Sequence, residues 1–388
     1  MNSRERVIAA INRTPLDRIP RQDGFWELTI GKFHEQGMPG LPKPRMLAVD
    51  GGLSKPVSNP VSDFFNFDFD YMYIDMSPRL ETAIIEDDGE KYKIKDRYGW
   101  TAWRMKNGSA DMQFLDHVIK TREDWERYKP RMIFNPADPA GARIDSESYY
   151  LHYTPYPSWK GAKQIYDAMR EQGRYMAYIA YGPFECFWRM RGFDESLMDL
   201  LLEPEWVGEI MDAEIDVLID TLQYCIDHGM KPDGFYAFED MGSTRAPLFS
   251  TRVYLDVIHP RHKRLGEFLH RNGIHFLMHS CGYVEPFIPY LIDAGLDVLQ
   301  ALQVNAGMDV LKLKPLYGDK LTFWGNIAVP SFEAGKEAIE KELRAKIPGA
   351  KQGGGYIYHS DHTISQAVTY ETYSHAMKLL DELGRYSA

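Results

Sequence analysis

The sequence predicts an α/β protein, a single (β/α)8 TIM-type barrel with an N-terminal extension and a β-hairpin insertion. After residue 160, short apolar runs recur, each followed by a stretch of helical periodicity, which is the pattern of parallel βαβ units. No glycine-rich dinucleotide-binding turn follows these runs, so a closed barrel is favoured over an open doubly wound sheet. We expect residues 1–388 to form one barrel domain, with excursions in residues 1–160 and regular units in residues 161–388.

The expected strands of the regular part are apolar runs bounded by polar segments. The stretches between them carry helical periodicity, as Leu197, Leu200 and Leu201 illustrate. The runs cover residues 176–181, 234–238, 274–278, 298–300, 321–324 and 356–358.

The N-terminal part shows three different patterns. Within residues 1–22, an amphipathic helix is predicted behind two possible capping residues, Asn2 and Ser3, with Val7, Ile8 and Ile11 on one face. Residues 40–62 are rich in Pro, Gly and Ser, which predicts a long surface loop. Residues 70–103 contain short alternating runs around Asp87-Asp88-Gly89, which predicts an antiparallel β excursion.

Composition excludes several classes of protein. Hydrophobic residues make up 44% of the chain, which excludes a disordered protein, and the net charge of −11 argues against a nucleic-acid partner. Only three cysteines occur, Cys186, Cys225 and Cys281, too few for a disulfide framework. The first residues lack an apolar signal core, and no apolar run approaches the length of a membrane span. We therefore expect a cytoplasmic protein with no membrane partner.

Polar side chains follow nearly every predicted strand. Active sites of (β/α)8 barrels form at the carboxyl ends of the strands, so these segments are where chemistry is expected. They carry titratable and metal-binding side chains at residues 181–186, 239–242, 279–282, 300–303, 325–327 and 359–362.

The segment His279-Ser-Cys281 predicts a metal site. Residues two apart in an extended segment project to the same side, so the imidazole and the thiol can converge on one ion. Zinc accepts both ligand types, and catalytic zinc sites use three protein ligands with one position open. The alternative is a core histidine beside a buried cysteine. Candidates for the third ligand are His362, His359, Asp361 and Glu239.

Glu239 and Asp240 form an acidic pair after the second of these strands. Burial near Phe235 and Phe238 would raise a carboxyl pKa and create a general acid, whereas a nearby metal would keep the group ionised. The alternative is a helix cap beside a solvated acid. Arg21 is a candidate for holding an anionic substrate, and its alternative is a surface ion pair.

Several separated motifs occur together in one order. They are Arg18-Ile-Pro20, Tyr181-Gly-Pro-Phe-Glu185, Arg191-Gly-Phe193, Leu197-Met-Asp199, Glu239-Asp240-Met-Gly242, His259-Pro260, His279-Ser-Cys281-Gly282, Gly325-Asn-Ile327 and the segment 353–362. In these motifs the chain resembles the uroporphyrinogen decarboxylase superfamily, and within it the cobalamin-linked methyltransferases. The resemblance implies a (β/α)8 barrel and a homodimer.

The resemblance also separates the branches of the superfamily. The decarboxylases hold a porphyrinogen with an Arg-Gln-Ala-Gly-Arg segment, whereas the similar segment here ends in Phe25, which weakens porphyrinogen decarboxylation. The coenzyme M methyltransferases bind zinc through His-x-Cys and a later Cys. His279 and Cys281 match the first two ligands, and His362 aligns near the position of the absent later cysteine. This departure argues against a close coenzyme M enzyme.

We therefore expect a zinc-dependent methyltransferase that moves a methyl group between a small donor and a corrinoid (cobalamin) protein. The predicted donor is a methoxylated aromatic, which makes the reaction an O-demethylation. The chain has no Asp-x-His-x-x-Gly cobalamin segment, so the corrinoid is expected on a separate partner protein. Two alternatives are a metal-free decarboxylase of a small anion, using Asp240 and Arg21, and a silent ligand-binding barrel. The expected roles are metal binding by His279, Cys281 and His362, catalysis by Glu239 and Asp240, and substrate binding by Arg21, Tyr181 and His359.

Overall fold

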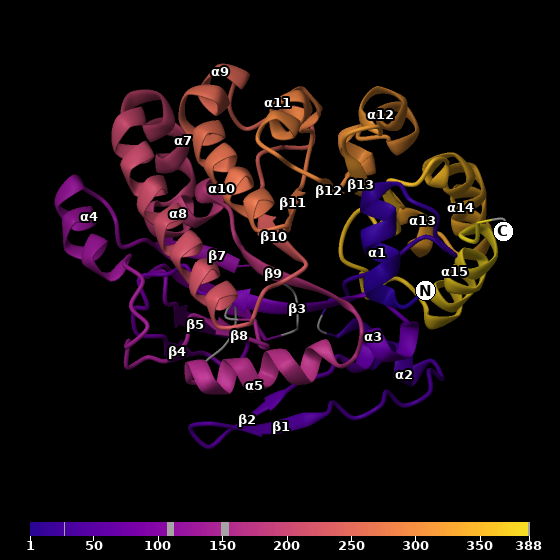
Figure 1. Cartoon of the computed structure of the whole chain (residues 1–388), viewed down its shortest axis with the longest axis horizontal. Helices are drawn as coiled ribbons and strands as arrows, with labels where there is room; N and C mark the ends of the chain where they lie inside the picture. The colour runs from indigo at the N-terminus through magenta and orange to yellow at the C-terminus, as the bar shows by residue number, and fades with distance from the viewer. Residues whose placement is uncertain (27, 107–111, 149–154, 387–388) are drawn as a thin grey trace.

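The computed structural model describes residues 1–26, 28–106, 112–148 and 155–386 (Figure 1). Its largest element is an eight-stranded sheet in the order β14-β13-β12-β11-β10-β9-β3-β8. All neighbours from β3 to β14 are parallel, and only β8 runs antiparallel, against β3. The strands are β3 (Phe69–Ile74), β8 (Ile144–Asp145), β9 (Tyr175–Tyr181), β10 (Gly234–Phe238), β11 (His275–Ser280), β12 (Val298–Ala301), β13 (Thr322–Gly325) and β14 (Tyr356–Ile357).

A short extended segment around Arg21 joins the strands β14 and β3. Tyr358 N donates to Pro20 O at 2.9 Å, and Gln22 N donates to Tyr358 O at 3.1 Å. On the other side, Asp68 N donates to Arg21 O at 3.0 Å. The segment therefore bonds to both ends of the parallel series, an arrangement consistent with the expected (β/α)8 barrel.

The six runs expected as strands after residue 160 correspond to β9–β14, and the structure confirms each of them. β3 differs from expectation, because its alternating residues were grouped with the antiparallel excursion. It pairs in parallel with β9 and is largely buried on both faces. Alternation here separates aromatic residues that line the cavity, such as Tyr71 and Tyr73, from residues on the other face of the sheet, so it does not mark a solvent-exposed sheet.

The antiparallel excursion follows β3 and forms its own four-stranded sheet, which Figure 1 shows to one side of the parallel strands. The turn at Asp87-Asp88-Gly89 connects the first two strands as expected, with Gly89 at a φ of 94°. The strands are β4 (Ala83–Asp87), β5 (Lys91–Lys95), β6 (Thr101–Met105) and β7 (Met112–Asp116).

The prediction of a loop over residues 40–62 is wrong for the second half of this range. That part forms a hairpin of β1 (Met46–Val49) and β2 (Leu53–Pro56), followed by the helix α3 (Pro60–Phe65). Gly51 and Gly52 both adopt positive φ, the backbone that a tight hairpin turn needs. The glycines that suggested a loop therefore make a turn.

The longer helices follow the strands as the βαβ pattern predicts. Among them α8 and α10 lie side by side on the outside of β9, β10 and β11 (Figure 1). The other helices are α1 (Ser3–Asn12), α2 (Thr29–Glu35), α4 (Arg122–Tyr128), α5 (Trp159–Arg170), α6 (Pro183–Arg191), α7 (Phe193–Leu202), α9 (Thr251–Val253), α11 (Ile288–Asp293), α12 (Val310–Tyr317), α13 (Val329–Glu333), α14 (Lys336–Lys351) and α15 (Tyr370–Leu383); α8 covers Pro204–Asp227 and α10 covers His259–Arg271.

The helix α1 closes the amino-terminal end of the sheet interior. It begins at the expected cap, where the Asn2 side chain accepts from Glu5 N. Its residues Val7 and Ile11 pack in one buried cluster with residues that begin strands, among them Phe69 and Tyr175. The carboxyl ends of the strands are left as the end at which a ligand can enter.

Candidate active site

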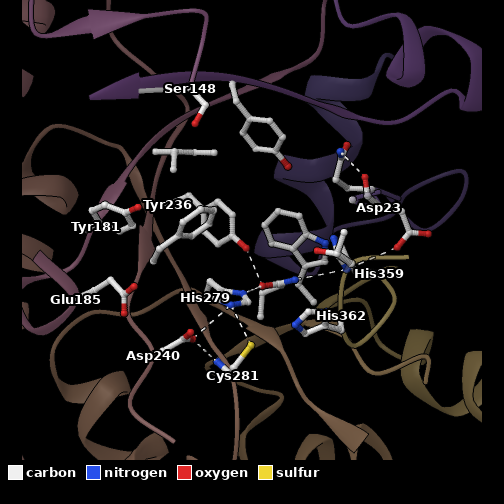
Figure 2. A pocket seen from close by; sticks show the side chains of 18 of the residues that line it. Asp23, Ser148, Tyr181, Glu185, Tyr236, Asp240, His279, Cys281, His359 and His362 are labelled. Carbon is white, nitrogen blue, oxygen red and sulfur yellow. Dashed lines mark hydrogen bonds and ion pairs between the residues drawn. The ribbon is translucent and has the colours of Figure 1, made fainter. Parts of the chain in front are cut away.

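A cavity of about 630 Å³ opens at the carboxyl ends of the strands (Figure 2). Aromatic rings form much of its wall, and polar side chains from successive strand ends point into it. Those with candidate roles are Asp23, Tyr181, Glu185, Arg189, Asp240, His279, Cys281, Gln300, His359 and His362.

Asp240, His279 and Cys281 converge at one point of this wall. The Sγ atom of Cys281 lies 3.2 Å from Nε2 of His279, and Oδ1 of Asp240 lies 3.4 Å from the same nitrogen. One nitrogen, one sulfur and one carboxylate oxygen from these residues all lie within 4.8 Å of one another. Among the residues that the structure describes, this is the one group of at least three such side chains close enough to hold a metal ion.

A hydrogen bond and a close contact between two loops hold this group together. Cys281 N donates to Oδ1 of Asp240 at 2.7 Å, which ties the segment after β10 to the segment after β11. A Cβ on Gly242 would meet Cys281 O at 2.7 Å, and Gly282, at a φ of 79°, would meet Gly242 at 2.3 Å. Glycine is therefore required at both positions for the two loops to touch.

The negative neighbours of His279 change its protonation. Burial alone lowers the pKa of His279, but the charges of Cys281 and Asp240 outweigh burial and raise this pKa to about 10. Without a metal, the ring is therefore an imidazolium that lies beside the side chains of Cys281 and Asp240. A cation is the natural occupant of such a position, whether it is a proton or a metal ion.

Gln300 fixes the orientation of the His279 ring. Nδ1 of His279 bonds to Oε1 of Gln300, and the Tyr236 hydroxyl donates to the same oxygen at 2.7 Å. Because an amide oxygen only accepts, Nδ1 carries the proton and Nε2 faces Cys281 and Asp240. Partners of this kind orient metal-binding histidines.

These residues fit a zinc ion by their chemistry. Histidine nitrogen, cysteine sulfur and aspartate oxygen are all ligands that zinc accepts, and three protein ligands leave one position for substrate or water. Cys281 and His279 come from the motif that the sequence singled out, whereas Asp240 was expected to act in catalysis together with Glu239.

His362, expected as the third ligand, lines the same cavity but lies outside the group of three. Its ring packs against Trp26, with centroids 5.7 Å apart, and the residue is exposed. The sheet order explains the difference, because β14 is three strands away from β11 while β10 is its neighbour. A ligand role for His362 stays a prediction.

Glu239 does not line the cavity, contrary to the role of acid expected for it. Its carboxylate accepts from Phe184 N at 3.1 Å and Glu185 N at 3.0 Å, at the start of α6. The residue before α6 is Gly182, which has no side chain to cap the helix. Glu239 supplies that cap from β10, and its remaining partner is His262 Nε2 at 3.0 Å. Alternation along an extended segment sends Asp240 into the cavity and Glu239 to the opposite side.

Arg21 also lies outside the cavity, contrary to the substrate contact expected for it. Its Nη1 bonds to Oδ1 of Asp381 at 2.7 Å and its Nε to Asn66 O at 3.1 Å, in a separate surface depression. The alternative of an ion pair therefore describes its position. Gln22, the next residue, is the one that turns into the cavity.

Tyr181 and His359 do line the cavity, as expected for residues that contact substrate. Nδ1 of His359 donates to Ser360 O at 2.5 Å, which leaves Nε2 as an acceptor. Burial lowers the pKa of His359, against the opposing charge of Asp23, so the ring is neutral near neutral pH. A neutral ring can accept a hydrogen bond from a substrate hydroxyl.

Among the polar residues of the wall that sequence reasoning did not assign to the site are Glu185 and Gln300. Both belong to segments that follow predicted strands, so their position was a signal, but neither carries a metal-binding or acid-pair pattern. Sequence reasoning did not assign the aromatic residues to a ligand pocket, because most of these rings lie on strands and look like core residues. The lining includes Phe25, Trp26, Tyr71, Tyr73, Tyr236, Phe238 and Trp324.

Comparison with known proteins supports the relationship that the motifs suggested. The family model described as uroporphyrinogen decarboxylase (URO-D) matches residues 165–383, more than half of the chain. The chain belongs to the uroporphyrinogen decarboxylase family. Among solved structures, this family member is similar to a methyltransferase from Methanosarcina mazei, with 14% identity, coverage of 98% of this chain and 99% of that chain, and a TM-score of 0.58. It is also similar to a putative vitamin-B12 independent methionine synthase from Listeria monocytogenes, with 12% identity, coverage of 57% and 66%, and a TM-score of 0.33. No curated protein matches the sequence.

The first of these structural similarities extends over the full chain and shows a shared fold. Within the part of the chain that the structure describes, no helix is both long and apolar enough to cross a membrane.

Proposed function

We propose that this member of the uroporphyrinogen decarboxylase family is a zinc-dependent methyltransferase. It would take a methyl group from a methoxylated aromatic compound and pass it to a corrinoid carried by a partner protein. The observation that carries the proposal is the group of Asp240, His279 and Cys281 on the wall of the cavity. A decarboxylase without metal has no need for a thiol beside an imidazole and a carboxylate.

The proposed metal ligands are Asp240, His279 and Cys281, with His362 as a candidate from another part of the cavity wall. Bound zinc would supply Lewis acidity at the ether oxygen of the donor, where charge develops as the methyl group leaves. Gln300 holds the His279 ring with Nε2 toward the other two ligands. The protein fixes the ligand side chains before the donor arrives.

The aromatic wall supports an aromatic donor. Tyr236, Phe238 and Trp324 line the cavity, and the Tyr236 and Trp324 rings lie 5.1 Å apart by centroid. Flat apolar surfaces of this kind bind a benzene ring and exclude water from the reacting bond. His359 offers Nε2 as an acceptor for a ring hydroxyl, and Tyr181 lines the same cavity.

A methyl-transfer assay tests this proposal. The purified protein is mixed with methoxylated benzoates or phenols and a reduced corrinoid protein, and both the methylated corrinoid and the phenol product are measured. We expect equal amounts of the two products. Release of CO₂ from a small carboxylate, surviving Cys281→Ala, would instead favour the metal-free decarboxylase.

Two further outcomes are informative. Tight binding of an aromatic ligand without turnover, with every tested corrinoid protein, would favour a silent binding barrel. The homodimer implied by the family resemblance is a separate proposal, which sedimentation of the purified protein tests directly.

A further inference from the structure

Glu185 is a carboxyl group on the cavity wall that lies outside the group of proposed metal ligands. It follows β9 in the first turn of α6, and only 6% of the residue is exposed. Trp188 Nε1 donates to its Oε2 at 3.0 Å, and Arg189 Nη2 donates to its Oε1 at 2.6 Å. The carboxyl group is therefore held in one place on the cavity wall.

Glu185 belongs to the same side of the cavity as the proposed metal ligands. β9, β10 and β11 are neighbours in the sheet, and Tyr181, Phe238 and His279 lie in register across them. Glu185 follows β9, Asp240 follows β10, and His279 lies on β11. Figure 2 shows Glu185 on the Asp240 side of the group.

The surroundings of Glu185 raise the pKa of its carboxyl group. Burial raises the pKa of this carboxyl, Arg189 opposes the rise, and the negative charges of Asp240 and Glu239 add to it. The net direction is upward. Glu239 also accepts from Glu185 N, which holds the helix start and its side chain in position.

We propose that Glu185 is the general acid that protonates the leaving oxygen of the methoxylated donor. As the bond between this oxygen and the methyl carbon breaks, its electron pair stays on the oxygen, which takes the proton of Glu185. The reduced corrinoid of the partner protein supplies the pair for the new bond to the methyl carbon. The products are a phenol and the Glu185 carboxylate, and a proton from solvent restores the acid.

Arg189 and Trp188 stabilise the carboxylate that this step leaves behind. Both donate hydrogen bonds to the carboxyl oxygens, and donors to the charged form favour it once the proton has gone. Glu185 thus takes the role that the sequence suggested for Glu239. This inference rests on the proposed methyl transfer, so its test must separate the two.

The test compares two donors that differ in the basicity of the leaving oxygen. One is a methoxybenzene without electron-withdrawing groups, and the other carries a nitro group that stabilises the phenolate. In Glu185→Gln we expect the rate with the first donor to fall about 10²- to 10⁴-fold and the rate with the nitro donor to fall far less. Equal losses with both donors would overturn the inference while leaving methyl transfer by the wild type intact.

Two controls accompany this comparison. Glu195→Gln changes an exposed glutamate of α7 and should leave both rates unchanged. Zinc content should be the same in Glu185→Gln and the wild type, because Glu185 is outside the group of ligands.

A second measurement needs no turnover. Infrared difference spectra of the wild type minus Glu185→Gln, recorded over a range of pH on the proteins as purified, should show the carbonyl stretch of a protonated carboxyl at pH values at which an exposed glutamate is already ionised. Absence of this band would overturn the inference even if the protein transfers no methyl group.

Discussion

The Sγ atom of Cys281 lies 3.2 Å from Nε2 of His279, close enough for both atoms to bind one ion. Their spacing of two residues brings the side chains to the same side of an extended segment. Asp240 joins them from the adjacent strand β10, where its Oδ1 also accepts from Cys281 N. The group therefore depends on one motif in the sequence and on one neighbour that the sheet order supplies.

Removing the partner of His279 should weaken metal binding. Gln300→Ala deletes the acceptor for Nδ1, so the ring loses its fixed orientation, and we expect zinc affinity to fall about 10- to 100-fold. Competition with a chromophoric chelator measures the change. Gln303→Ala is the comparison, because Gln303 bonds to Gly282 N and leaves the His279–Gln300 contact in place. Unchanged affinity in Gln300→Ala would contradict the role given to Gln300.

Gly182 leaves room for the Glu239 carboxylate under α6. A Cβ at this position would lie 2.4 Å from Oε2 of Glu239, so Gly182→Ala must displace the cap of the helix. We expect a loss of about 1–3 kcal/mol in the free energy of unfolding. Gly31→Ala in α2, where a Cβ meets nothing within 4 Å, should be neutral or stabilising. Chemical denaturation of both variants checks the contrast, and similar effects would argue against it.

Asp68 anchors the segment that joins β14 and β3. Its buried carboxylate bonds to Arg6 Nη1 at 2.8 Å, to Arg18 Nη1 at 2.7 Å and to Arg21 N at 2.8 Å. Asp68→Ala leaves two largely buried guanidinium groups without this partner, and we expect a loss of about 3–5 kcal/mol in stability. Asp216→Ala breaks an exposed ion pair with Arg264 and should cost less than about 1 kcal/mol. Equal costs, measured in urea, would refute this account of Asp68.

Much of the parallel sheet could be predicted because its strands are short apolar runs that end in polar segments. The segment around Arg21 could not, since it is a polar stretch whose bonds to Tyr358 and Asp68 depend on distant parts of the chain. β3 was misread for a related reason. Its alternation reflects aromatic residues that line the cavity on one face and packed residues on the other, which a sequence does not distinguish from a half-exposed strand.

The candidate site was predictable where it depended on local spacing, as with His279 and Cys281. The place of Asp240 depends on strand order, which the sequence does not state. Glu239 and Arg21 carry suitable chemistry but point out of the cavity, because a shift of one residue in an extended segment reverses the side to which a side chain points. Gln300 and Glu185 acquire their proposed roles only through the partners that folding brings to them.

The stability of the protein should fall as the pH rises, because Asp70 is buried. Burial raises the pKa of Asp70 to about 6, against the opposing charge of Arg174. The folded protein therefore keeps a proton that the unfolded chain releases near pH 4. The free energy of unfolding consequently falls as the pH rises from about 4 to about 6. Asp70→Asn should reduce this fall by up to about 3 kcal/mol.

Urea unfolding across this pH range measures the effect of Asp70. The control is Asp63→Asn, which changes the more exposed partner of the same arginine. An unchanged pH dependence in Asp70→Asn would contradict the raised pKa.

The metal content of the purified protein tests the central claim most directly. It is measured in protein prepared without chelators, for the wild type and for Cys281→Ala, Asp240→Ala, His362→Ala and the control Cys225→Ala, which changes a buried cysteine of α8. We predict about one zinc per chain in the wild type, lost in the first two variants and kept in the control. Loss in His362→Ala as well would add that residue to the ligands. A wild type that holds no zinc, even after zinc is offered, would contradict the account.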